Sequence, residues 1–307
     1  MKKNMILLTI LTILVMAVIV LTCVLWYKIS TENYVAKPIF TLETYPRVDA
    51  SLATQPLTDA YIKAFVGKDV DLESIEYTNT HPAYIKLING ETDLIVVTEP
   101  SQEELELAKK AGVELVVTPV VKEGFVFYVN GNNPVDSLTI EQIQKIYTGE
   151  ITNWKAVGGN DELIRAFQRP ANSGSQTGML SLVMNGLEMM TPPKKDLVET
   201  MEAIINLVSD YDNGKNSIGY SYYYYATTMY STIDENIANG IKLLKINGIA
   251  PNDETIQNGE YPLQTAYYIV TRKDAENNGP VQTLKKAMLS PKGQNIAKEA
   301  GYVKYHK

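Results

Sequence analysis

The sequence has 307 residues, of which 45% are hydrophobic and 21% charged, and a formal net charge of −7. This composition is that of a globular chain of one or two domains, and its acidic balance argues against nucleic-acid binding, which needs a basic surface. One cysteine, Cys23, and two histidines, His81 and His306, exclude an intrachain disulfide and a cysteine-based zinc motif. We therefore expect no metal, no cofactor and no catalytic triad.

Residues 5–26 form an uninterrupted run without a charge. As a helix, this run would be about 33 Å long, enough to cross the hydrocarbon core of a bilayer. Lys2 and Lys3 precede it, so the positive-inside rule places the chain after Lys28 outside the cytoplasm. We expect residues 1–29 to be an uncleaved transmembrane anchor and residues 30–39 a tether.

An alternative is a lipoprotein signal in which Cys23 becomes the lipid anchor. Thr22 precedes this cysteine, whereas such signals usually carry Gly, Ala or Ser there. Both predictions hold an extracytoplasmic domain at the cell membrane.

Strand-like and helix-like segments alternate from residue 40 onward, which is typical of an α/β fold. In chain order, the expected elements are a strand at 45–48, helices at 60–65 and 82–88, strands at 94–97, 115–121 and 125–129, helices at 139–147, 180–187 and 197–208, a strand at 267–270 and a helical region at 280–300. The two strand-rich stretches, 116–129 and 264–271, suggest that the chain crosses twice between two lobes, as in receptors that close about a hinge.

Three segments rich in Ser and Thr precede helix candidates, at 49–57, 78–84 and 169–178. Each offers hydroxyls and backbone N–H groups at a helix start, which bind anions without a countercharge. The third segment adds Arg169, whose planar guanidinium suits two oxygens of one anion. Plain helix capping explains each segment taken alone equally well.

Several longer stretches are similar to one known family. They are 137–143, 147–155 with Gly158 and Gly159, 169–178, 216–220, 245–251 and 261–263. In these stretches the chain resembles the phosphate-binding proteins of ABC-type uptake systems, in particular the membrane-anchored proteins of Gram-positive bacteria. The resemblance spans about 45–302 and implies a type II periplasmic-binding-protein fold. In this fold, two α/β lobes joined by crossing strands would comprise 40–122 plus 245–307 (lobe 1) and 123–244 (lobe 2).

The resemblance also implies which residues contact phosphate. They are Ser51, Leu52, Ala53, Thr80, Thr98, Arg169, Ser173, Gly174 and Ser175. Leu52 and Ala50 depart from the family pattern, since they lack a hydroxyl and the backbone freedom of glycine. Thr98 replaces an aspartate that accepts the proton of hydrogenphosphate in some members. We take the adjacent Glu99 as a candidate acceptor, with an exposed residue of no such role as the alternative.

The function implied is the capture of inorganic phosphate outside the cytoplasm for delivery to ABC permease subunits, without catalysis. An oxyanion sensor or adaptor with the same fold and no transport role is the alternative. A phosphate-ester hydrolase is a third, less favoured hypothesis, because the chain has only two histidines that could act as a general base.

Overall fold

The computed structural model describes residues 14–22, 24, 38–210, 214–230 and 240–306. The chain divides into two compact units, Met1–Ile39 and Phe40–Lys307. Residues 14–22 are helical and exposed. Among the described residues no helix combines the length and apolar character that crossing a bilayer requires. Cys23, residues 30–37 of the tether and most of the expected anchor lie outside the described residues.

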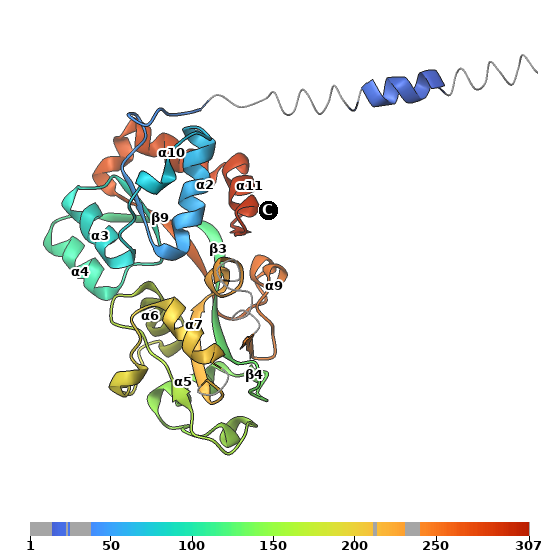
Figure 1. The fold of residues 1–307 in the computed structure, drawn as a ribbon. Helices are drawn as coiled ribbons and strands as arrows, with labels where there is room; N and C mark the ends of the chain where they lie inside the picture. Colours follow the sequence, from blue (N-terminus) through green and yellow to red (C-terminus); the bar gives the residue numbers. More distant parts are fainter. Residues whose placement is uncertain (1–13, 23, 25–37, 211–213, 231–239, 307) are drawn as a thin grey trace, which may run out of the picture. The chain divides into compact units, whose positions relative to one another are not determined.

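One mixed sheet forms the centre of the second unit (Figure 1). In the described part of the chain its strands follow the order β1-β2-β9-β3-β6-β5, and β7 and β10 also pair with β3. The strands are β1 Val48–Ala50, β2 Leu94–Val97, β3 Leu115–Asn130, β5 Arg165–Ala166, β6 Ser217–Tyr222, β7 Ile241–Leu243, β9 Gln264–Arg272 and β10 Val303–Lys304. A separate parallel pair joins β4, Ser137–Leu138, to β8, Lys245–Ile246.

Strand β3 connects the two halves of this sheet. From Leu115 to Gly124 it pairs with β9, and from Phe125 onward it pairs with β6. Gly124 stands at the change of partner, where an added Cβ would come within 2.8 Å of the Ile256 side chain. The absence of a side chain there lets the neighbouring layer approach the strand closely.

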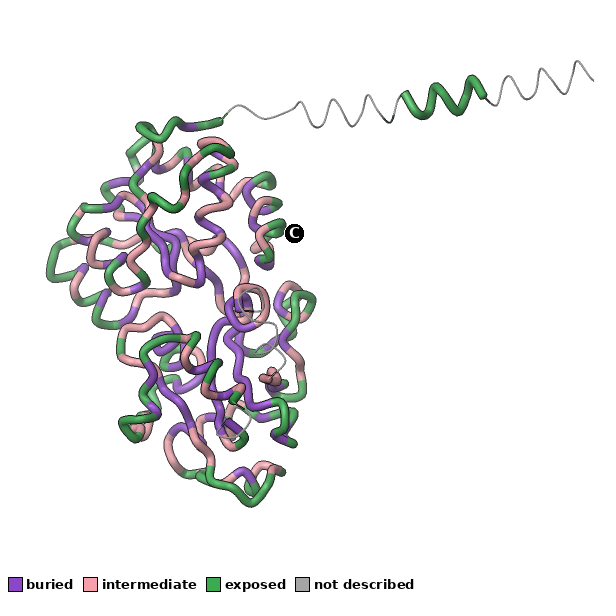
Figure 2. Tube along the Cα trace, viewed as in Figure 1, coloured by how far each residue is buried: buried purple, intermediate pink, exposed green. Residues whose placement is uncertain are grey.

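The helices are α2 Gln55–Phe65, α3 Thr80–Asn89, α4 Gln102–Lys110, α5 Ile140–Thr148, α6 Gly174–Gly178, α7 Met201–Ser209, α9 Asp253–Asn258, α10 Gly279–Leu289 and α11 Pro291–Glu299. Strand β2 has helices on both faces, so its four apolar residues are all buried. Leu94 and Val96 pack in the cluster that contains α2, whereas Ile95 and Val97 pack in the cluster that contains α3. Burial on both faces explains why the residues of β2 form a continuous apolar run in the sequence. Figure 2 shows that burial is concentrated in the strands.

The expected elements agree with the structure to different degrees. The strand expected at 94–97 is β2 itself, and the helix expected at 139–147 is α5, which Thr139 caps. The two strands expected at 115–121 and 125–129 are one strand, β3, because Gly124 stays extended and paired. The helical region expected at 280–300 is two helices, since Ser290 ends α10 and caps α11.

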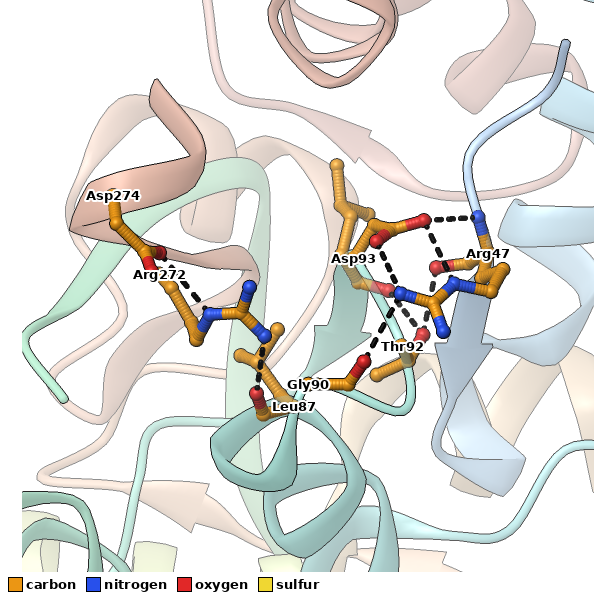
Figure 3. Close-up of polar contacts among 8 residues, drawn as sticks. Arg47, Leu87, Gly90, Thr92, Asp93, Arg272 and Asp274 are labelled. Carbon is orange, nitrogen blue, oxygen red and sulfur yellow. Dashed lines mark hydrogen bonds and ion pairs between the residues drawn. The ribbon is translucent and has the colours of Figure 1, made fainter. Parts of the chain in front are cut away.

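A polar network fixes the end of α3 to the strands (Figure 3). The Arg47 guanidinium donates to both carboxylate oxygens of Asp93, at 2.7 and 3.1 Å, and to the Gly90 carbonyl at 3.0 Å. The Thr92 hydroxyl donates to the Arg47 carbonyl at 2.6 Å, and Arg272 of β9 donates to the Leu87 carbonyl at 3.2 Å. The last turn of α3 is thereby held against β1, β2 and β9.

Candidate functional site

Strands β1 and β2 run parallel, so their carboxyl ends lie at the same edge of the sheet. Ser51 follows β1 there, and Thr98 follows β2. Because α3 leads back into the start of β2, its first residue, Thr80, also lies at the edge where β2 ends. This is the edge at which open α/β sheets bind ligands.

The other half of the sheet contributes Arg169 and the start of α6. Arg169 follows β5, and its backbone N–H donates to the side chains of Gln176 and Tyr220. Ser173 is the N-cap of α6, and its hydroxyl accepts from the Gln176 N–H at 3.3 Å. The first amides of α6 have no partner within the helix.

These segments surround one cavity of about 290 Å³. All nine residues expected to contact the ligand line it. The lining also includes Asn79, His81, Pro82, Pro170, Ala171, Asn172, Glu199, Met201 and Tyr222. The three segments that capping alone would explain therefore share one cavity, and capping and ligand binding are compatible at each of them.

Arg169 carries the positive charge on the cavity wall. Its Nη1 lies 3.1 Å from the Ser175 hydroxyl, and its Nη2 donates to the Glu199 carbonyl at 2.7 Å. The buried Nε has no hydrogen-bond partner, and among the described residues no carboxylate pairs with the guanidinium. Burial lowers the pKa of Arg169 from its ordinary value. An anion in the cavity would supply the missing countercharge.

The Thr98 hydroxyl is a second buried polar group on this wall. It makes no hydrogen bond of good geometry to the described residues, although it lies near the Tyr222 hydroxyl, which donates to the Gly174 carbonyl. A Cβ on Gly174 would stand 2.6 Å from the Thr98 hydroxyl and 3.0 Å from that of Thr80. The glycine therefore lets the two halves meet around the cavity.

The loop that follows β1 has fewer free backbone N–H donors than the resemblance implies. The Leu52 N–H donates to Asn79 Oδ1 at 3.2 Å, and the Ser51 N–H donates to the Val96 carbonyl at 3.2 Å. Ala53 lies in the first turn of the 3-10 helix Leu52–Thr54, where amides have no intrahelical partner. Of the three backbone donors that the resemblance implies here, Ala53 is the one that this arrangement leaves for a ligand.

Glu99, the candidate acceptor for the ligand's proton, is absent from the described lining of the cavity. Its carboxylate accepts a hydrogen bond from the Ser181 hydroxyl. Asn172 similarly donates to the Glu103 carboxylate of α4. Both contacts join the two halves of the sheet beside the cavity, and the side chain of Glu99 is used for that purpose.

Two asparagines on the cavity wall were missed by sequence reasoning. Asn79 and Asn172 have φ angles of 76° and 64°. Asn79 combines its positive φ with a ψ of 176°, which lies outside the left-handed helical region, and sparsely populated conformations of this kind gather at functional sites. Both lie in the Ser/Thr-rich segments, but nothing in the sequence marks their backbone conformation.

A model described as the PBP superfamily domain matches residues 44–291. Among curated relatives, the phosphate-binding protein PstS of Borreliella burgdorferi is 28% identical over 208 residues, 66% of this chain and 68% of that protein. The phosphate-binding protein PstS of Staphylococcus saprophyticus is 26% identical over 267 residues, 83% of this chain and 78% of that protein.

Crystal structures with the same fold cover most of the chain. A Clostridium perfringens protein crystallised with bound phosphate superposes with a TM-score of 0.63 at 24% identity, over 84% of this chain and 98% of that one. An ABC-type phosphate transport receptor from Vibrio cholerae superposes with a TM-score of 0.61 at 21% identity, over the same shares.

Proposed function

Because the chain belongs to the PBP superfamily, we propose that it is the extracytoplasmic solute-binding protein of an ABC-type phosphate uptake system. Membership and the similar crystal structures confirm the type II periplasmic-binding-protein α/β fold. The curated relatives are phosphate-binding proteins by name, which supports capture rather than catalysis. The chain would take inorganic phosphate and pass it to ABC permease subunits.

One observation carries the proposal. Two buried polar groups, Arg169 Nε and the Thr98 hydroxyl, lack hydrogen-bond partners on the wall of the same cavity. Seven other buried side-chain atoms of the described residues also lack a partner, but none belongs to a residue of this lining. What indicates a polar ligand is that these two atoms belong to the lining of one cavity and that one of them is part of a buried guanidinium. The ligand must accept hydrogen bonds and carry negative charge, since Arg169 has no carboxylate partner in the described part of the chain. A tetrahedral oxyanion meets both requirements.

Isothermal titration calorimetry of the purified full-length chain tests this function. We expect saturable binding of phosphate and weaker binding of sulfate. At about 100 times the dissociation constant, phosphate should stabilise the fold by about 2.7 kcal/mol, visible as a rise in melting temperature. If phosphate gives neither heat nor a thermal shift, the proposed function is wrong.

Closure between two lobes would complete the site. In this proposal, lobe 1 comprises 40–122 plus 245–307, and lobe 2 comprises 123–244. The change of partner along β3 supports the first crossing. The pairing of β9 with the first part of β3 supports a return of the chain to lobe 1 in its C-terminal part. A ligand that contacts both lobes favours the closed form by the difference between its affinities for the two forms.

Retention of the N-terminus at the membrane is part of the same proposal. The apolar run at 5–26 would anchor the domain, and residues 30–39 would keep it near the permease. Mass spectrometry of the protein extracted from membranes separates the two anchors. An intact N-terminus supports the helix, whereas a chain that begins at a lipidated Cys23 supports the lipoprotein alternative.

A further inference from the structure

With Glu99 engaged elsewhere, the cavity needs another group to accept the proton of hydrogenphosphate. Arg169 is a donor only, and Glu199 is exposed. His81, in the first turn of α3, lines the cavity with a side chain that is 32% exposed. The hydroxyls and the Asn79 and Asn172 amides of the described lining can donate as well as accept, whereas an imidazole whose tautomer is fixed presents one nitrogen as an acceptor only.

A buried carboxylate fixes the His81 ring. Nδ1 lies 2.9 Å from Glu104 Oε1, and the Glu104 side chain is 1% exposed. The other oxygen, Oε2, accepts the Ser101 backbone N–H at 2.7 Å. Both carboxylate oxygens are therefore in use, and the orientation of the group is determined by the capping of α4.

The hydrogen bond of one ring nitrogen determines the role of the other. A Glu104 carboxylate accepts from Nδ1–H, so a singly protonated ring has its lone pair on Nε2. The two nitrogens point in diverging directions, and within the described residues Nε2 makes no hydrogen bond. In the singly protonated ring, Nε2 is therefore an acceptor on a residue that lines the cavity.

We propose that His81 is a specificity-determining residue whose Nε2 accepts the proton of hydrogenphosphate, with Glu104 as the residue that positions its tautomer. The proposal rests on the proposed function. Sulfate carries no proton at neutral pH, so its oxygen would face the Nε2 lone pair without a hydrogen bond. An unmatched polar contact of this kind weakens binding more than the absence of a contact does.

The variant His81→Asn tests the role of Nε2. The Asn amide can still donate to Glu104 in place of Nδ1–H, but it has no group at the position of Nε2. At mildly alkaline pH, where phosphate is chiefly the monoprotonated dianion, calorimetry with phosphate and with sulfate should show the affinity ratio falling by about tenfold or more. His81→Phe, which also lacks an acceptor, is the second variant if the first fails to fold.

The variant Glu104→Gln tests the positioning role. In this variant the Ser101 N–H still donates to a side-chain oxygen, so the carbonyl oxygen of Gln occupies the position of Oε2. The Gln NH₂ then donates to Nδ1 of His81, and the ring proton is on Nε2. The acceptor then becomes a donor, and sulfate affinity should rise while phosphate affinity falls. His306→Asn, in the other histidine of the chain, is exposed near the C-terminus and should leave both affinities unchanged.

Two results would overturn the assignment of His81. One is that His81→Asn and His81→Phe leave both the phosphate and the sulfate affinity unchanged. The other is an equal fold loss of affinity for both anions, which would make the ring a non-selective contact. An unchanged ratio in folded Glu104→Gln would remove Glu104 from the mechanism. Failure of the unsubstituted chain to bind either anion is a different result, because it rejects the proposed function together with this inference.

Discussion

Arg169 differs from the nearby Arg165 in what surrounds its charge. Arg165 forms an ion pair with Asp196, and its guanidinium lies 4.7 Å from the centre of the Phe167 ring. Arg169 donates hydrogen bonds to the Ser175 hydroxyl and the Glu199 carbonyl, and its Nε has no partner among the described residues. The first arrangement is complete without a ligand, and the second is not. Two arginines four residues apart in the sequence thus have different roles.

We expect Arg169→Lys to lower phosphate affinity by about tenfold to a hundredfold, because an ammonium keeps the charge but cannot hold the planar, multidentate geometry. Arg165→Lys is the matched control. It should lower the melting temperature and leave affinity within about twofold, since Arg165 lies outside the cavity lining. Calorimetry and thermal melting measure the two effects, and equal affinities for the two variants would contradict the assignment.

Thr98→Val should separate binding from stability. The buried Thr98 hydroxyl lacks a well-formed hydrogen bond, so replacing it by a methyl group should leave the melting temperature unchanged or raise it. Phosphate affinity should fall, by about fivefold or more, because one donor to the ligand is lost. Thr92→Val is the control: it should lower the melting temperature and leave phosphate affinity unchanged, since the Thr92 hydroxyl donates to the Arg47 carbonyl and Thr92 lies outside the cavity lining. A loss of stability in Thr98→Val would argue for a structural role.

At the scale of the elements, the start of α6 determines how closely the two halves of the site approach each other. Gly174 allows this approach because a Cβ there would overlap the Thr98 hydroxyl. We expect Gly174→Ala to fold and to bind phosphate about tenfold more weakly, since the added methyl holds the halves apart.

Gly279, at the start of α10, is the control for that substitution because a Cβ there would meet no atom within 4 Å. Gly279→Ala should leave affinity unchanged. Calorimetry of the two variants gives the comparison, and unchanged affinity in Gly174→Ala would show that the halves do not meet through this residue when the ligand binds.

At the scale of the whole domain, Glu123 occupies the point at which β3 changes partners. It is 2% exposed, and its Oε1 accepts from the backbone N–H groups of Gly124 and Tyr224 at 2.9 and 3.1 Å. The ionisable groups that influence it are tyrosines of β6, β9 and the C-terminal segment, and burial raises the pKa of Glu123 to about 8.

A raised pKa gives this carboxyl a definite effect on stability. The folded state holds the proton more tightly than the unfolded state, so the contribution is complete below the ordinary pKa of 4.5 and is lost as pH rises toward 8. Relative to Glu123→Gln, the unsubstituted chain should lose up to about 1 kcal/mol of stability per pH unit in that window.

Denaturant unfolding at several pH values measures this difference. Glu141→Gln is the control, since Glu141 is exposed and pairs only with Lys145 on the same helix face. Parallel pH profiles for the unsubstituted chain and Glu123→Gln would show that Glu123 does not hold its proton in the fold.

Much of the architecture could be predicted because its causes are local. The apolar run at 94–97 predicts a strand buried on both faces, and Thr139 and Gly149 mark the ends of α5 through capping and a left-handed φ of 85°. The nine site residues that the resemblance implies line one cavity. Their contact with phosphate stays a prediction.

The sequence by itself determined the α/β class and the Ser- and Thr-rich helix starts that line the cavity, since periodicity and capping act over a few residues. Tertiary structure alone decided that β3 is one continuous strand, that Asn79 Oδ1 accepts the Leu52 N–H, and that His81 rather than Glu99 lines the cavity. The physical reason is that these outcomes depend on how segments distant in the sequence pack and pair. No local pattern specifies the distance between α3 and α4, which brings Glu104 to His81.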